Sequence, residues 1–128
     1  MAATNDTKNH PQHPESQRVR RGHAFYPTAQ EVANIPRMYA TEDVRAADKM
    51  LHLHYFVGGC DWWFAEYDPA TGEGFGYACL GDPQNAEWGY TDLAELEAVS
   101  VHGGLAVVER DLHWTPVPAR EANLPGLR

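Results

Sequence analysis

Residues 51–80 constrain the fold more than any other part of the chain, because alternating side chains and two turn signals occur together there. Alternation places every second side chain on the same face of an extended strand. Gly58-Gly59 separates the first predicted strand from the second, and a turn at residues 69–72 separates the second from the third. The stretch therefore predicts a β-meander of neighbouring antiparallel strands.

Two short helices are predicted, one before and one after this meander in the sequence. Thr28 and Glu31 have the spacing of a capping box, and Pro36 ends the helix that they would begin. Thr91 can cap a second helix that extends to about Val99. We therefore expect an α+β fold, in which two short helices pack on an antiparallel sheet of four to five strands.

The length of 128 residues suits a single domain. Residues 1–22 lack periodicity, which predicts a disordered N-terminal tail before one α+β domain over residues 23–128. No apolar run approaches the roughly 18–20 residues that a membrane span needs. We accordingly expect a cytoplasmic protein that does not contact a membrane.

The chain is acidic, with 18 Asp and Glu against 10 Lys and Arg and a formal net charge of −8. Between Leu51 and Asp111, Arg110 is the only Lys or Arg. A field of this sign repels nucleic acid and attracts basic protein surfaces. We therefore expect the partner to be a basic protein surface, with no direct nucleic-acid contact. The alternative is that the acidity only maintains solubility.

The acidic part of the chain supplies candidates for a partner-binding face, with tryptophans as aromatic anchors. Trp62 and Trp63 point to opposite faces of one strand, so both are buried only if both faces of the sheet are covered. Exposed tryptophans would instead suit a small-ligand-binding module, and core packing is a third role for such rings. The candidate partner-binding residues are Asp61, Glu66, Asp68, Glu73, Asp82, Glu87, Asp92, Glu95, Glu97, Trp63 and Trp88.

His52 and His54 are candidate metal ligands. Alternation puts both imidazoles on one face of a strand, about 6–7 Å apart along it, which suits two ligands of one metal ion. The alternative is a pair of histidines that pack beside Phe56 and bond to carboxylates. A metal-binding protein or a metal-dependent enzyme would need further ligands, for which the sequence offers Glu66, Asp68 and His113.

No residue is predicted to be catalytic. Glu66 could form an acid–base pair with Glu109 or Asp111, but solvated carboxylates are the commoner role on an acidic protein. Ser100 does not lie in a nucleophile elbow. The glycine-rich residues 72–76 lie at a hairpin rather than between a strand and a helix, and they include a glutamate, which argues against nucleotide binding. We expect a non-catalytic protein without a cofactor.

The two cysteines, Cys60 and Cys79, match no metal or redox spacing. If the second hairpin turns near residues 70–71, Cys79 lies opposite Trp62 and is a diagonal neighbour of Cys60. This leaves a disulfide open, and two reduced buried thiols are the preferred interpretation.

Several sequence blocks occur in one order along the chain: residues 38–43, 48–49, 62–68, 75–76, 87–90, 93–97, 104–105 and 108–112. Together these blocks resemble the domain-of-unknown-function 2958 family. The resemblance covers roughly residues 27–118 and implies a small bacterial protein often found with plasmid and integrative-element cargo, including anti-restriction genes. The family has no established activity, so the resemblance implies no catalytic residue.

Together, the resemblance and the acidic composition lead to a specific expectation. The chain would be a non-catalytic inhibitor of a nucleic-acid-binding host-defence effector, of the anti-restriction or anti-CRISPR type. Its carboxylates would occupy a groove lined by Lys and Arg in place of phosphates.

Overall fold

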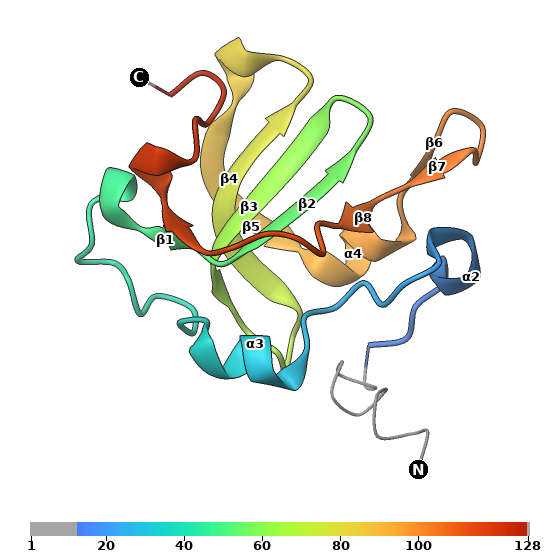
Figure 1. Cartoon of the computed structure of the whole chain (residues 1–128), viewed down its shortest axis with the longest axis horizontal. Coiled ribbons are helices and arrows are strands. Elements are labelled where there is room, and N and C mark those ends of the chain that lie inside the picture. The colour runs from blue at the N-terminus through green and yellow to red at the C-terminus, as the bar shows by residue number, and fades with distance from the viewer. Residues whose placement is uncertain (1–12, 128) are drawn as a thin grey trace.

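A five-stranded antiparallel sheet forms the centre of the computed structural model, which describes residues 13–127 (Figure 1). The order of the strands across the sheet is β5-β4-β3-β2-β8. The α+β architecture and the predicted meander are confirmed. The strands are β2 (Leu53–Val57), β3 (Cys60–Tyr67), β4 (Glu73–Leu80), β5 (Glu87–Asp92) and β8 (Glu109–Arg110).

Glycines make the two meander turns at the predicted places. Gly58 and Gly72 have φ angles of 55° and 86°, in the left-handed region that glycine adopts without steric cost. In the first hairpin, Val57 lies opposite Cys60. In the second hairpin, the amide of Asp68 donates to the carbonyl of Glu73 at 2.8 Å. Turn chemistry therefore sets the register of the three central strands.

A β-bulge interrupts the pairing of β3 with β4. Phe64 lies opposite Gly76, but Glu66 lies opposite Phe75, so Ala65 is the extra residue on β3. At Gly76 the backbone of β3 approaches so closely that a Cβ atom would lie 1.7 Å from the carbonyl oxygen of Trp63. Only glycine fits at this position.

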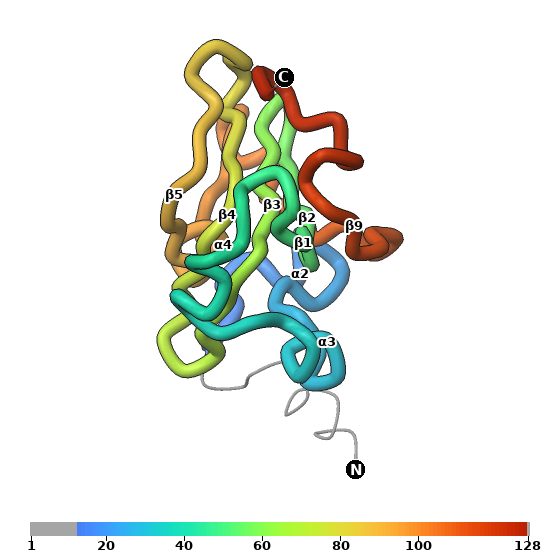
Figure 2. Tube along the Cα trace, turned by 90° about the vertical axis from the view of Figure 1, so that its left-hand side faces the viewer, coloured from blue at the N-terminus to red at the C-terminus, as the bar shows by residue number. Residues whose placement is uncertain are grey.

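One face of the sheet is covered, and the other is covered in part. One face packs against α3 (Ala29–Asn34), α4 (Leu93–Ala98) and the segment before α3, around Phe25, Tyr26 and Tyr55. The other packs against the C-terminal segment, which includes Ala119 and Leu124. In Figure 2 this segment and β5 lie at opposite sides of the view. Trp62 belongs to the first cluster and Trp63 to the second, so both rings are buried.

Short elements complete the described part of the chain. Strand β1 (Met50–Leu51) pairs with strand β9 (Val117–Pro118), and Leu51 lies opposite Val117. This pairing ties the C-terminal segment to the sheet. The remaining elements are α2 (Arg18–Arg21), β6 (Ser100–Val101), β7 (Ala106–Val107) and the 3-10 turns η1 (Ala46–Asp48), η2 (Pro83–Asn85) and η3 (Ala119–Glu121).

Both predicted helices are present, and one begins differently from the prediction. Thr28 and Glu31 form the capping box at the start of α3, where the backbone amide of each donates a hydrogen bond to the other's side chain. At α4, the side chain of Asp92 accepts from the amide of Ala94 at 2.8 Å. The cap is therefore Asp92 and not Thr91, because β5 continues through Thr91.

The N-terminal segment differs from the predicted tail over residues 13–22; residues 1–12 lie outside the described residues. The buried guanidinium of Arg21 donates to the carboxylate of Glu97 at 2.9 Å and to the carbonyl of Val108 at 2.6 Å. The backbone amides of Ser16 and Gln17 donate to the same carboxylate, each at 2.9 Å. This segment therefore packs on α4 and belongs to the domain.

The two cysteines lie on opposite faces of the sheet. Cys79 is opposite Asp61, one residue away from the predicted register, and belongs to the cluster under the C-terminal segment. Cys60 packs against the other cluster. Both thiols are free, and the sheet itself separates them. Over residues 13–127, no helix is long and apolar enough to cross a membrane.

Candidate binding face on strands β4 and β5

Four aromatic rings form a continuous patch over β4 and β5, and we call Tyr39, Phe75, Trp88 and Tyr90 the aromatic patch. The strand register places Phe75 opposite Tyr90. The ring centroid of Phe75 lies 5.0 Å from that of Tyr90 and 5.9 Å from that of Trp88, and Tyr39 lies 6.1 Å from Tyr90. Tyr39 and Tyr90 are 56% and 54% exposed, so the patch faces solvent.

The buried carboxylate of Glu66 holds Tyr39 in place. Glu66 is only 3% exposed and accepts hydrogen bonds from the amide of Tyr39 at 2.8 Å and the amide of Thr41 at 3.1 Å. The hydroxyl of Thr41 also donates to Glu66. Tyr39 has a φ angle of 69°, which is costly for a tyrosine and is maintained by these bonds.

Lys49 is the cation of this region, and its ammonium group is already engaged. It donates to the carbonyl of Thr41 at 2.5 Å and to the hydroxyl of Thr41 at 2.9 Å. It also lies 5.6 Å from the centroid of Phe75. Lys49 therefore supports the turn that carries Tyr39 rather than presenting a positive charge to solvent.

A surface pocket of about 390 Å³ opens beside the patch. Desolvation, then Tyr39, and then the carboxylates of Glu66, Glu42 and Glu73 raise the pKa of Tyr90. The three carboxylates therefore lie close enough to Tyr90 to add to the effects of desolvation and of Tyr39. The pocket is lined by Tyr39, Glu42, Lys49, Glu66, Phe75 and Tyr90.

Two predicted surface acids are buried, which corrects their assignment to a partner-binding face. Glu66 accepts hydrogen bonds from the turn that carries Tyr39, and Glu97 forms an ion pair with Arg21. Trp63 is also buried, at 6% exposed, and stacks on His54 with a centroid distance of 5.1 Å. None of these three side chains can contact a partner in the folded protein.

The remaining predicted acids do not gather on one face. Glu73 lies opposite Asp92 at the end of the β4–β5 pair, beside the aromatic patch. Asp82 is bound within the η2 turn, and Asp61 is bound to His54. Half-buried acids are Asp61, Asp68 and Glu73, and exposed acids are Asp82, Glu87, Asp92 and Glu95. Trp88, half-buried, is the predicted anchor that belongs to the patch.

The two candidate metal ligands, His52 and His54, contact different sets of residues. His54 bonds Asp111 through Nδ1 at 2.9 Å and Asp61 through Nε2 at 2.8 Å, so both ring nitrogens are occupied. The ring also stacks on Phe56 at 5.7 Å, as in the alternative interpretation. Burial by itself would raise the pKa of Asp111, but hydrogen bonds from His54 and from the His113 amide hold it below its usual range.

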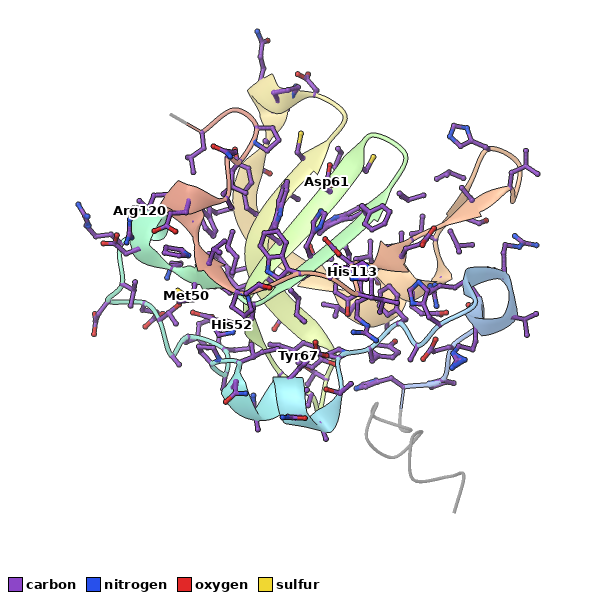
Figure 3. All side chains as sticks on the ribbon, in the orientation of Figure 1. Met50, His52, Asp61, Tyr67, His113 and Arg120 are labelled. Atoms are coloured by element: carbon purple, nitrogen blue, oxygen red, sulfur yellow. The ribbon has the colours of Figure 1, made fainter. Side chains whose placement is uncertain are left out.

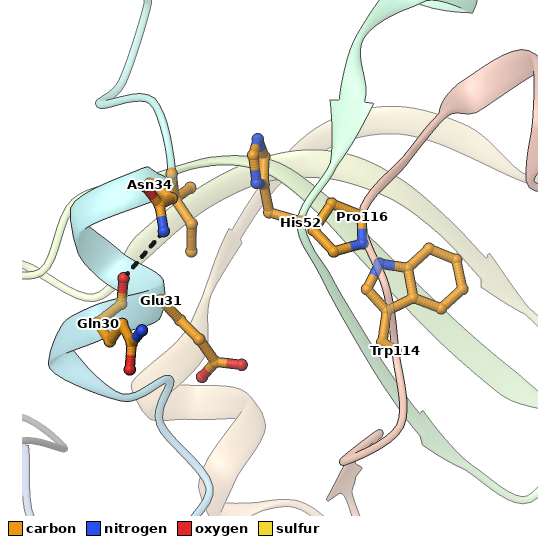
Figure 4. Close-up of a pocket in the computed structure, with 7 residues that line it drawn as sticks. Gln30, Glu31, Asn34, His52, Trp114 and Pro116 are labelled. Atoms are coloured by element: carbon orange, nitrogen blue, oxygen red, sulfur yellow. Dashed lines mark hydrogen bonds between the residues drawn. The ribbon is translucent and has the colours of Figure 1, made fainter.

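His52 instead lines a separate surface pocket between α3 and the C-terminal segment (Figure 4). Burial lowers the pKa of this imidazole. His113 lies well apart from His52 (Figure 3). Over residues 13–127, no three His, Cys, Asp or Glu side chains are placed to hold a metal ion. The pocket is lined by Gln30, Glu31, Asn34, Ile35, His52, Trp114 and Pro116.

The carboxylates considered for acid–base chemistry bind separate groups. Glu66 accepts bonds from the Tyr39 turn, whereas Asp111 bonds to His54. Glu109 lies 3.6 Å from the imidazole of His23. These contacts indicate structural roles for all three carboxylates.

Sequence reasoning missed three residues of the candidate face: Tyr39, Glu42 and Phe75. The register of β4 with β5 could have placed Phe75 beside Tyr90, because both lie at alternating strand positions. Tyr39 and Glu42 carry no such signal, since a long-range bond to Glu66 brings their turn to the sheet.

Comparison with known proteins gives one match. The family model for proteins of unknown function, DUF2958, matches residues 28–119. A search of curated proteins and a search of solved structures each found no match to the chain. The matched range contains all four rings of the aromatic patch and the carboxylate of Glu66.

Proposed function

The chain belongs to the DUF2958 family of proteins of unknown function, and from its surface chemistry we propose that it is a non-catalytic interaction protein that binds a basic protein surface. The observation that supports this proposal is an exposed aromatic patch bordered by the carboxylates of Glu42 and Glu73. Aromatic faces attract Arg and Lys side chains, and nearby carboxylates bond to the same groups. Aromatic residues are also the usual anchors of protein interfaces.

The class of partner follows from the charge. Proteins that bind nucleic acid carry grooves lined by Lys and Arg, which neutralise phosphates. An acidic, aromatic face can occupy such a groove as a decoy. We infer an inhibitor of a nucleic-acid-binding host-defence effector, of the anti-restriction or anti-CRISPR type, acting in the cytoplasm.

A charge-reversal pair tests this function. The variant Glu42→Lys/Glu73→Lys changes two carboxylates that neighbour Tyr90, and Glu95→Lys changes an exposed carboxylate on α4. Each tagged protein is used to capture partners from a nuclease-treated lysate of the native host. We expect the wild type and Glu95→Lys to retain a nucleic-acid-binding protein, and the double variant to lose it.

Salt provides the second readout. Binding between opposite charges weakens as ionic strength rises, whereas a purely apolar contact does not. Capture that is equal for all three proteins, or that is unchanged by salt, would exclude the proposed function.

A further inference from the structure

Strand β5 is the last strand on its side of the sheet, and its outer edge is open. It pairs with β4 on one side and with no other strand of the described chain. An edge strand presents unpaired N–H and C=O groups, which can pair with a strand from another molecule.

The register identifies which backbone groups face this edge. Just beyond the β4–β5 pairs, the amide of Leu93 donates to the carbonyl of Gly72 at 2.8 Å. Directly opposed residues in an antiparallel pair alternate between bonded and non-bonded pairs. Alternate residues counted back from Leu93 therefore bond to β4. The N–H and C=O groups of the intervening residues, Trp88 and Tyr90, point away from the sheet.

These two residues are also members of the aromatic patch. Over residues 13–127, no hydrogen bond outside the strand pairing involves the backbone of Trp88 or Tyr90. A strand added to β5 would bond to the backbone of Trp88 and Tyr90. Every second side chain of that strand would then lie on the patch face, beside their rings.

We propose that β5 accepts an extended segment of the partner as an added antiparallel strand, with Arg or Lys at alternate positions over the aromatic patch. This inference rests on the proposed function and specifies how the partner binds. Asp92 lies at the end of β5 on the same face as Trp88 and Tyr90, Glu73 lies opposite Asp92, and Glu42 lines the pocket beside Tyr90. These charges favour a basic segment over the exposed rings.

The same charges disfavour a second copy of the chain as the occupant. Every copy carries the same carboxylates beside its patch and a formal net charge of −8, so two copies would repel each other at this edge.

A set of three peptides tests the added strand. The probe is an eight-residue peptide that alternates Arg and Val, blocked at both ends. In the added strand, the Arg side chains lie over the patch, and the backbone amides of the same Arg residues point toward β5. N-methylation of every Arg therefore removes the amides that bond to β5. N-methylation of every Val alters only amides that face away, and this peptide is the matched control.

We expect N-methylation at Arg to weaken binding at least about tenfold, and N-methylation at Val to change it by less than about threefold. Binding of the unmodified peptide should also slow amide hydrogen exchange at Trp88 and Tyr90, with little change at Gly89. Equal losses for both methylated peptides, or binding without amide protection, would exclude strand addition and leave the patch as an interface. Failure of the unmodified peptide to bind at low salt would also exclude it, and the capture experiment would still decide the proposed function.

Discussion

At the scale of single residues, the candidate face depends on Glu66. Its carboxylate is the acceptor for three donors in the turn that carries Tyr39, and it lies under the exposed rings. The negative charge of Glu66 therefore acts inside the protein, where it positions the turn that carries Tyr39, and it is not part of the exposed surface.

Replacement of this carboxylate by an amide should disturb both stability and the patch. In Glu66→Gln, the amide NH2 group would face backbone N–H donors, leaving buried groups unsatisfied. We expect a loss of about 1–3 kcal/mol in the free energy of unfolding by urea, with faster hydrogen exchange at the Tyr39 amide. The control Glu95→Gln, at an exposed position, should leave both unchanged. Slow exchange at Tyr39 in Glu66→Gln would show that other contacts hold the turn.

Glu97 should make stability depend on pH. Burial alone would raise the pKa of Glu97, but hydrogen bonds from Gln17, Ser16 and Arg21 hold it below its usual value. Its contribution is therefore fully present above the pKa of an unfolded glutamate, about 4.3, and is lost as pH falls through the lower folded pKa.

The variant Glu97→Gln isolates this effect. Urea unfolding from about pH 6 to about pH 3 should show the largest stability difference from wild type at the upper end, with the difference shrinking as the pH falls. A difference that stays constant with pH would mean that the ionised carboxylate of Glu97 is not what Arg21 stabilises.

These two acids also show where prediction from sequence ends. Composition identified them as carboxylates of an acidic chain, but their donors lie far away in sequence: Tyr39 and Thr41 for Glu66, and Ser16 and Arg21 for Glu97. Only the folded chain distinguishes an internal acceptor from a solvated charge. The pairing of His54 with carboxylates, by contrast, was the alternative interpretation of the two histidines, and the structure shows it for His54.

At the scale of elements, the meander was predictable because its turns and alternation are local signals. Gly58 and Gly72 fixed two hairpins, and Thr28 with Glu31 fixed the start of α3. The bulge at Ala65 was not predictable, since it depends on how closely β3 and β4 approach.

Two glycines that lie opposite each other test the β4 contact. Gly76 and Gly89 are register partners on β4 and β5. A Cβ at Gly76 would overlap the Trp63 carbonyl, whereas one at Gly89 meets nothing within 4 Å. We expect Gly76→Ala to lose at least about 3 kcal/mol of unfolding free energy and Gly89→Ala to lose less than about 1 kcal/mol. Similar losses for both would contradict the close approach of β3.

At the scale of the whole molecule, the covered sheet leaves one partly open aromatic surface. The N-terminal segment, α3 and α4 cover one face, and the C-terminal segment covers part of the other. Phe75, Trp88 and Tyr90 lie on that second face, at the side of the sheet away from β8. The net charge of the chain could be read from the sequence, but the position of these rings on the sheet could be known only from the order of the strands.

Photo-crosslinking from the patch tests the central claim most directly. A benzophenone amino acid replaces Tyr90 in one variant and Leu105, an exposed residue on the β6–β7 turn, in a matched control. Both variants are expressed and irradiated in the native host, and crosslinked proteins are identified by mass spectrometry. We expect position 90 to crosslink to a nucleic-acid-binding protein through a basic segment, and position 105 to give no such product. Absence of a product from position 90, or the same product from both positions, would contradict a binding face on β4 and β5.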